Sequence, residues 1–75
     1  MEIEEGRIYS REKYYRPNEG FLFLLKIINR GMSFVTVGVI KSECEGLKEL
    51  GARYSLEINY FKDNYILVEK SIEKI

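Results

Sequence analysis

The feature that most constrains the fold of this chain is a series of short, mostly apolar segments separated by loops rich in Gly, Asn and Asp. Segments of this length, with turn-forming residues between them, are typical of β-strands joined by tight connections. The sequence therefore predicts a compact antiparallel β domain. The predicted strands cover residues 21–28, 32–41, 54–61 and 65–72.

The segments 21–28 and 32–41 have the composition of central strands. Alternate side chains of an extended strand point to opposite faces, and both faces of each segment are mostly apolar. Strands that are covered on both sides have this composition. Gly38 predicts a bulge or a sharp bend, and Gly31 is expected in the left-handed region of a three-residue hairpin loop.

Other segments indicate turns and a further strand. Residues 16–20 predict a sharp reversal, since they contain a proline that restricts its own backbone and that of the preceding residue. The segment 6–15 before this turn is expected to be a fifth strand, and residues 62–64 are expected to form another turn. The side chains expected on the inward side of the last strand are Ile66, Val68 and Ile72.

One short helix is predicted at residues 43–50. Ser42 followed by Glu45 forms a capping box, and Gly51 is a typical helix terminator. The two leucines of this segment are expected to pack on the sheet, because so short a helix depends on such packing. The period of two resumes cleanly after it, from residue 54 onwards.

These elements predict one small β domain over residues 1–75. We expect a mainly β fold, a five-stranded antiparallel curled sheet or barrel of the SH3-like or OB-like kind, with one helical turn before the fourth strand. The likeness is one of architecture, and no family motif occurs in the sequence.

The composition excludes most familiar catalytic sites. The chain has no histidine, so it can form neither a Ser-His or Cys-His pair nor a Cys/His zinc site. Cys44 is the only cysteine and lies between Glu43 and Glu45, whose charges disfavour a reactive thiolate. We therefore expect no catalytic residues, no metal, no cofactor and no enzymatic activity.

The charge is balanced over the chain but not along it. Twelve basic and twelve acidic side chains give a net charge of 0, which offers no overall attraction to nucleic acid or to a membrane. Residues 7–41 hold seven bases against two acids, so an anion-binding surface is expected in this half. With no export signal, no long apolar run and one cysteine, we expect a cytoplasmic protein with no membrane partner.

The first candidate site lies in the segment that precedes the proline turn. In an extended strand, alternate cationic and aromatic side chains would share one face, which suits single-stranded nucleic acid because cations neutralise phosphates while bases stack on rings. The alternative is an edge strand whose long cationic side chains discourage aggregation between sheets. The candidate ligand-binding or nucleic-acid-binding residues are Arg7, Tyr9, Arg11, Lys13 and Tyr15.

The second candidate site is the apolar excess of the central hairpin. Side chains on its second face need a cover, and exposed apolar patches usually mark an interface. The alternative is that curvature of the sheet and the short helix bury them. The candidate interface residues are Leu22, Leu24, Ile28, Phe34 and Ile40.

Three functions are compatible with these observations. We expect first a non-enzymatic module that binds a protein partner or ligand stoichiometrically, as a homodimer built on the central hairpin; a regulator or inhibitor encoded by a mobile element is one role for such a module. The alternative is a small barrel that binds RNA or single-stranded DNA. A pocket for a small polar ligand ranks third.

Overall fold

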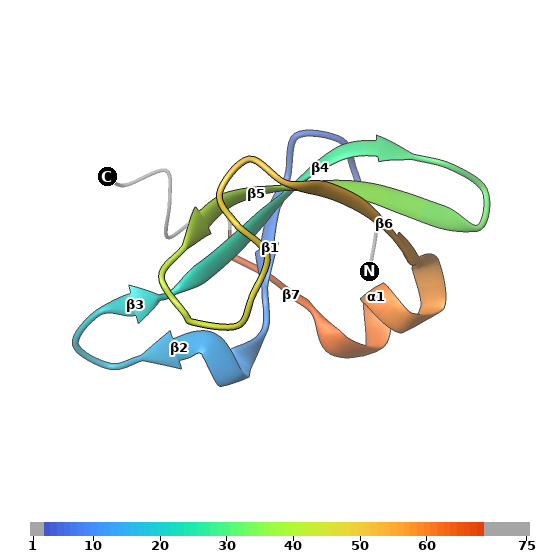
Figure 1. Cartoon of the computed structure of the whole chain (residues 1–75). Coiled ribbons are helices and arrows are strands. Elements are labelled where there is room, and N and C mark those ends of the chain that lie inside the picture. Colours follow the sequence, from blue (N-terminus) through green and yellow to red (C-terminus); the bar gives the residue numbers. More distant parts are fainter. Residues whose placement is uncertain (1–2, 69–75) are drawn as a thin grey trace.

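The computed structural model describes residues 3–68 of the chain (Figure 1). Short strands alternate with one long hairpin, a 3₁₀ turn and one short α-helix. In chain order the elements are β1 (Ile8–Ser10), the 3₁₀ helix η1 (Glu12–Tyr14), β2 (Tyr15–Arg16), β3 (Gly20–Phe21), β4 (Phe23–Arg30), β5 (Phe34–Ser42), β6 (Arg53–Glu57), α1 (Ile58–Asn64) and β7 (Ile66–Leu67).

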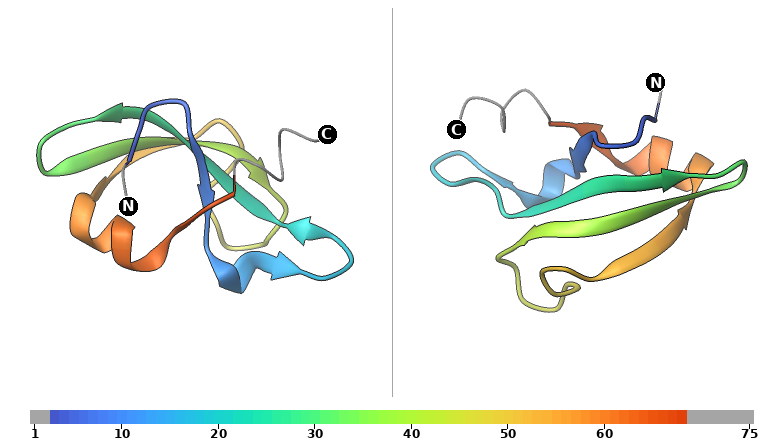
Figure 2. Two further views of the ribbon diagram at one scale, coloured as in Figure 1. Left: turned by 180° about the vertical axis from the view of Figure 1, so that it is seen from behind. Right: turned by 90° about the horizontal axis from the view of Figure 1, so that it is seen from above.

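Five strands form one antiparallel sheet in the order β6-β5-β4-β1-β7. The strands β2 and β3 form a separate two-stranded hairpin. The predicted mainly β fold with a five-stranded antiparallel sheet is therefore confirmed. Figure 2 shows that α1 lies near the tip of the β4–β5 hairpin, whereas the β2–β3 hairpin lies at the opposite end of the molecule.

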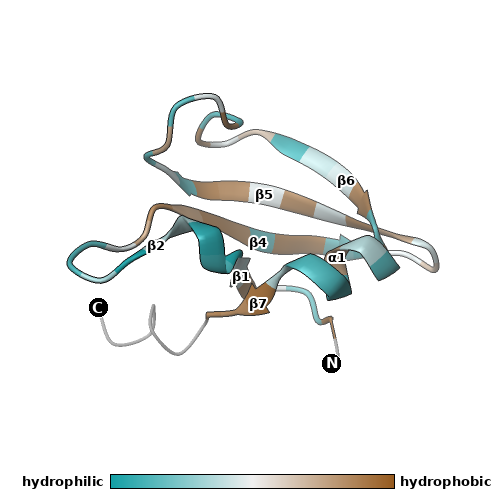
Figure 3. Ribbon diagram, turned by 90° about the horizontal axis from the view of Figure 1, so that it is seen from below, coloured by the Kyte–Doolittle hydropathy of each residue, from teal (hydrophilic) through white to brown (hydrophobic). Residues whose placement is uncertain are grey.

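The core is built on alternate residues of the two longest strands. Phe23, Leu25 and Ile27 of β4 point to the same side as Val35 and Val37 of β5, and all five are buried. Figure 3 shows that hydrophobic residues are concentrated along β4 and β5, whereas α1 is mostly hydrophilic. The hairpin therefore supplies most of the apolar surface on which the other elements pack.

The α1 helix is attached to this core through one aromatic ring. The Phe61 side chain is fully buried, and its ring meets the ring of Tyr9 edge-on at a centroid distance of 5.0 Å. On its other side Phe61 stacks on Tyr65, with centroids 4.7 Å apart and an interplanar angle of 11°. These contacts join α1 to β1 and to the start of β7.

Gly38 allows close packing next to a bulge. The pairing of β4 with β5 shifts between Ile27 and Asn29, so Ile28 is the extra residue. A Cβ atom at position 38 would lie 3.3 Å from Cδ1 of Ile28. A second shift leaves Ile40 as an extra residue of β5 itself. A bulge thus exists near Gly38 in its own strand and another in the neighbouring strand, where the missing side chain of Gly38 leaves room for Ile28.

The prediction of a helix at residues 43–50 is wrong, because this segment is a loop of turns. Ser42 Oγ donates to the backbone carbonyl of Lys48 at 2.7 Å instead of capping a helix. Gly46, in the middle of the segment, has a φ angle of +81°, a left-handed conformation that does not continue a helix. Gly51, just after the segment, has a φ angle of +89°. These two glycines therefore allow the tight turns of the loop.

The helix lies instead at Ile58–Asn64, in place of the second half of the predicted strand 54–61 and of the predicted turn at 62–64. Glu57 caps it, since its Oε1 accepts a hydrogen bond from the backbone N–H of Tyr60 at 2.9 Å. Ile58 and Phe61 are both buried, and a spacing of three places them on one helix face. The strand pattern is therefore followed only as far as Glu57.

The first predicted strand, residues 6–15, is also divided. Its extended part is β1, after which the N–H of Tyr14 donates to the carbonyl of Arg11 at 3.0 Å and forms the 3₁₀ turn. The predicted reversal at residues 16–20 is confirmed by the β2–β3 hairpin. A three-residue loop also joins β4 to β5, but Gly31 is not among the glycines with positive φ.

The last predicted strand, residues 65–72, is described only in part. Its observed strand is β7, and of the side chains expected to point inward Val68 is buried and Ile66 is partly buried. Ile72 lies outside the described residues. The short β7 pairs with β1, where Tyr9 lies opposite Leu67.

The first prediction concerns the ring that holds α1. Phe61→Ala removes a fully buried ring and leaves a cavity beside Tyr9 and Tyr65, so the free energy of unfolding should fall by about 3–5 kcal/mol. Chemical denaturation followed by circular dichroism measures this change. Lys62→Ala, an exposed position on the same helix, is the control and should change stability by less than about 0.5 kcal/mol. Similar losses for both variants would contradict the role of Phe61.

Candidate functional site

The predicted basic and aromatic strand face does not exist as one surface. Tyr9 is only 1% exposed and packs against Phe61, so it cannot stack on a base. The cause is the position of β1 between β4 and β7, which makes it an inner strand of the sheet. The 3₁₀ turn that follows then changes the direction of the remaining side chains.

The other four residues of that set lie in different surroundings. Arg7 Nε is 2.9 Å from Oε1 of Glu4, and the ring of Tyr15 lies 5.0 Å from that of Phe21 in the small hairpin. Arg11 and Lys13 line the same open pocket next to the helix α1. These two cations are the part of the predicted set that belongs to the site described below.

The predicted apolar interface is also divided. Leu24 is only 4% exposed, whereas Phe34 is 55% exposed. Leu22 and Ile28 are partly buried, and Ile40 is exposed. Phe34 and Ile40 are six residues apart on β5, which separates them by roughly 20 Å. Curvature and side-chain packing therefore cover part of this face, and the exposed members do not form one compact patch.

Four tyrosines from different parts of the chain come together on another surface. Tyr14 is in η1 and Tyr54 in β6. Tyr60 is in α1, and Tyr65 follows that helix directly. Tyr14 and Tyr54 both pack against the core cluster that contains Tyr65, and Tyr14 and Tyr60 lie near enough to Tyr54 and Tyr65 to affect the pKa of both. We refer to Tyr14, Tyr54, Tyr60 and Tyr65 as the tyrosine cluster.

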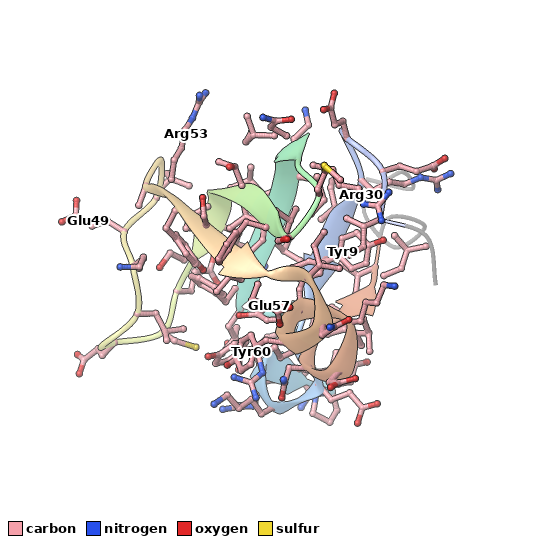
Figure 4. The ribbon with its side chains drawn as sticks, turned by 90° about the vertical axis from the view of Figure 1, so that its right-hand side faces the viewer. Tyr9, Arg30, Glu49, Arg53, Glu57 and Tyr60 are labelled. Carbon is pink, nitrogen blue, oxygen red and sulfur yellow. The ribbon has the colours of Figure 1, made fainter. Side chains whose placement is uncertain are left out.

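The tyrosine cluster is held in place by the core. Tyr65 stacks on Phe61 as described, and the ring of Tyr14 meets that of Phe23 edge-on at 5.4 Å. Tyr60 is different, because it is 46% exposed; Figure 4 shows it projecting from α1. The cluster therefore combines rings whose positions are set by packing with one ring that is accessible to a partner.

Three cations lie over rings of the tyrosine cluster. The Arg11 guanidinium is 5.6 Å from the ring centre of Tyr65, and its Nη2 donates to Oδ1 of Asn64 at 3.3 Å. Lys13 Nζ lies 5.3 Å from the ring centre of Tyr14. Lys48 Nζ, from the loop after β5, is 5.1 Å from that of Tyr54. Each distance is within the range of a cation–π contact.

An open pocket of about 410 Å³ adjoins the cluster beside Tyr65. Its wall is formed by the segment around η1 and by the end of α1. Three cations and two carboxylates line it, so its charge is mixed with a small positive excess. The lining residues are Arg11, Glu12, Lys13, Lys62, Asp63, Asn64, Tyr65 and Ile66.

Burial changes the acidity of two phenols in the cluster. It raises the pKa of Tyr54 well above the ordinary value of 10.0, and the nearby hydroxyls of Tyr65, Tyr14 and Tyr60 raise this pKa further. Burial also raises the pKa of Tyr65, with an added effect of Tyr60, while Arg11 acts in the opposite direction. Both phenols are therefore neutral at physiological pH and can donate hydrogen bonds.

Comparison with known proteins gives no match. No protein-family model, no curated protein and no solved structure matches this chain. Among the described residues, no helix has the length and apolar character needed to span a membrane. A functional interpretation therefore depends on the geometry of the tyrosine cluster and its surroundings.

The second prediction uses the raised pKa values. Above about pH 10 the phenols of the unfolded chain lose protons while folded Tyr54 keeps its proton, so the unfolded state binds fewer protons and stability falls as pH rises. This contribution is fully present below pH 10 and is lost as pH increases through the folded pKa. Tyr54→Phe has no such proton, so its unfolding free energy should fall less steeply in denaturant titrations between about pH 8 and pH 11. Parallel curves for both proteins would refute the assignment.

Proposed function

We propose that this protein is a non-enzymatic, SH3-like binding module that binds an extended, acidic segment of a partner protein at the tyrosine cluster. The observation that carries the proposal is the convergence of four tyrosines, three of which have a cation over the ring. Binding is stoichiometric, and the effect on the partner is that of a regulator or inhibitor.

The order of the strands supports the SH3-like interpretation. The sheet runs β6-β5-β4-β1-β7, the connection from β1 to β4 is long and contains a small hairpin, and a helix joins the last two strands. Small barrels of the SH3 type have this succession of elements, and they bind extended peptides in grooves lined by aromatic side chains. The tyrosine cluster lies between the long connection and the helix, where such a peptide would be bound.

The chemistry of the cluster supports a protein partner. Tyrosine rings provide a large contact area and lose little conformational entropy on binding, and their hydroxyls hydrogen bond to backbone carbonyls. Arg11, Lys13 and Lys48 add positive charge around the rings, which complements acidic side chains. The chain has no histidine, so the familiar histidine-dependent catalytic pairs are absent.

Binding of RNA or single-stranded DNA remains the alternative. The cations and rings of the cluster could contact phosphates and bases, but Tyr9 has no part in such a site because it is buried. The balanced net charge also gives little long-range attraction to a polyanion. A single-stranded oligonucleotide is therefore tested alongside the peptides.

The third prediction tests the cluster with a matched pair of variants. Peptides selected on the wild-type protein from a displayed random library should be enriched in Asp and Glu. Tyr60→Ala should weaken their binding by about tenfold or more, because exposed interface tyrosines commonly contribute over 1 kcal/mol. Tyr15→Ala is the control, since Tyr15 is 48% exposed but lies outside the cluster. Calorimetric titration with a selected peptide gives both affinities.

Two outcomes would contradict this proposal. Equal affinities for the Tyr60→Ala and Tyr15→Ala proteins would show that the peptides bind elsewhere. If no peptide is enriched while a single-stranded oligonucleotide binds with a steep dependence on salt, the nucleic-acid alternative replaces the protein partner.

A further inference from the structure

The strand β6 has an unpaired edge. It is the last strand in the sheet order, and among the described residues only β5 pairs with it. Figure 3 shows β6 at the margin of the sheet with no element beside its outer edge. Such an edge is a template for another strand, and natural edge strands often avoid this by carrying proline or lysine, neither of which occurs in β6.

The register of β6 on β5 determines which backbone groups face outward. Val39 donates to Ala52 and Ile58 donates to Ser33, both at 2.9 Å. Hydrogen-bonded and non-hydrogen-bonded pairs alternate along an antiparallel ladder, so Tyr54 and Leu56 direct their backbone groups toward β5. The backbone groups of the odd-numbered residues of β6, with Ser55 at the centre, therefore face the open edge.

The side chains of β6 are self-complementary in charge. Arg53 begins the strand and Glu57 ends it, with Ser55 midway between them; Figure 4 shows Arg53 and Glu57 at its two ends. If two copies of β6 pair in antiparallel fashion about Ser55, each Arg53 lies directly opposite a Glu57. Opposite charges at directly opposed positions stabilise a strand pair, and like charges destabilise it.

We propose that the open edge of β6 binds the β6 edge of a second copy of this chain, with the two-fold axis passing between the two Ser55 residues. The partner is a second copy because a two-fold rotation about Ser55 places outward N–H groups opposite outward carbonyls. The same rotation places each positive Arg53 opposite a negative Glu57. The two Ser55 residues exchange a pair of backbone hydrogen bonds. The N–H of each Glu57 donates to the carbonyl of the opposite Arg53.

The pairing is also compatible with the contacts already present within each copy. Thr36 Oγ1 and Ser55 Oγ are 3.2 Å apart on the outer face, so a row of four hydroxyls would cross the joint between the copies. One carboxylate oxygen of Glu57 accepts from Tyr60, and the other is available to Arg53 of the second copy. The dimer uses the open edge and outer face of β6, whereas Tyr54, the member of the tyrosine cluster on β6, points to the opposite face of that strand.

The fourth prediction uses proline at the centre of the edge. The N–H of Ser55 faces outward, so Ser55→Pro, present in both copies, removes the two hydrogen bonds that the Ser55 residues exchange without removing one within the sheet. Sedimentation velocity over increasing concentration should give about twice 8.9 kDa for the wild type. The dissociation constant of Ser55→Pro should be larger by about tenfold or more. A wild type that stays at 8.9 kDa up to millimolar concentration would overturn the proposal.

A charge exchange tests the same interface without a change to the backbone. Arg53→Glu alone and Glu57→Lys alone each place like charges opposite one another, so each should be monomeric. Mixed together, they restore two opposite-charge pairs and should form a heterodimer, which native mass spectrometry resolves by mass. Lys26→Glu, the same charge reversal on the exposed β4 position, is the control and should dimerise like the wild type.

The mixture of the two variants tests the pairing even where a single variant is less stable than the wild type. Glu57→Lys removes the helix cap, so circular dichroism is recorded for each variant. A heterodimer in the mixture supports the pairing whatever the stability of Glu57→Lys alone. If the wild type dimerises but the two charge variants do so equally well and do not prefer each other, the dimer uses another surface and the proposal is wrong.

Discussion

The packing of the Phe61 ring between Tyr9 and Tyr65 is the contact on which the arrangement of the site depends. It fixes α1 against β1 and against the start of β7, and α1 carries Tyr60. Because aromatic rings prefer edge-on or offset-stacked contacts, this arrangement also restricts the orientation of the helix. The positions of two tyrosines of the cluster thus follow from one buried side chain.

The sequence predicts the sheet well and the helix badly, for a physical reason. Strands such as β4 and β5 are short, mostly apolar runs bounded by turn residues, a pattern typical of strands that are covered on both faces. The helix α1 is only seven residues long, too short for a clear period, and Ile58 fits both a strand and a helix. Burial of Phe61 decides between them. Residues 43–50 have the local capping signal, but the left-handed Gly46 interrupts the segment, and none of its side chains is fully buried to stabilise a helix.

The site could be predicted only in part. Arg11 and Lys13 were recognisable from the local excess of cations, and both lie beside the tyrosine cluster. Their aromatic neighbours were not, because Tyr54 and Tyr65 are distant from them in the chain and join them only through the topology of the sheet. Tyr9 was misassigned for the same reason: the exposure of a residue depends on the position of its strand, and β1 is an inner strand.

Two rings of the tyrosine cluster also pack in the core, and this limits which positions of the cluster can change in evolution. Tyr14 packs on Phe23 and Tyr65 on Phe61, so a substitution at either position alters the folded state together with the proposed binding surface. In a chain of 75 residues the reserve of stability is small. New specificity is therefore most readily acquired through Tyr60 and the surrounding cations, which can vary while the buried rings remain unchanged.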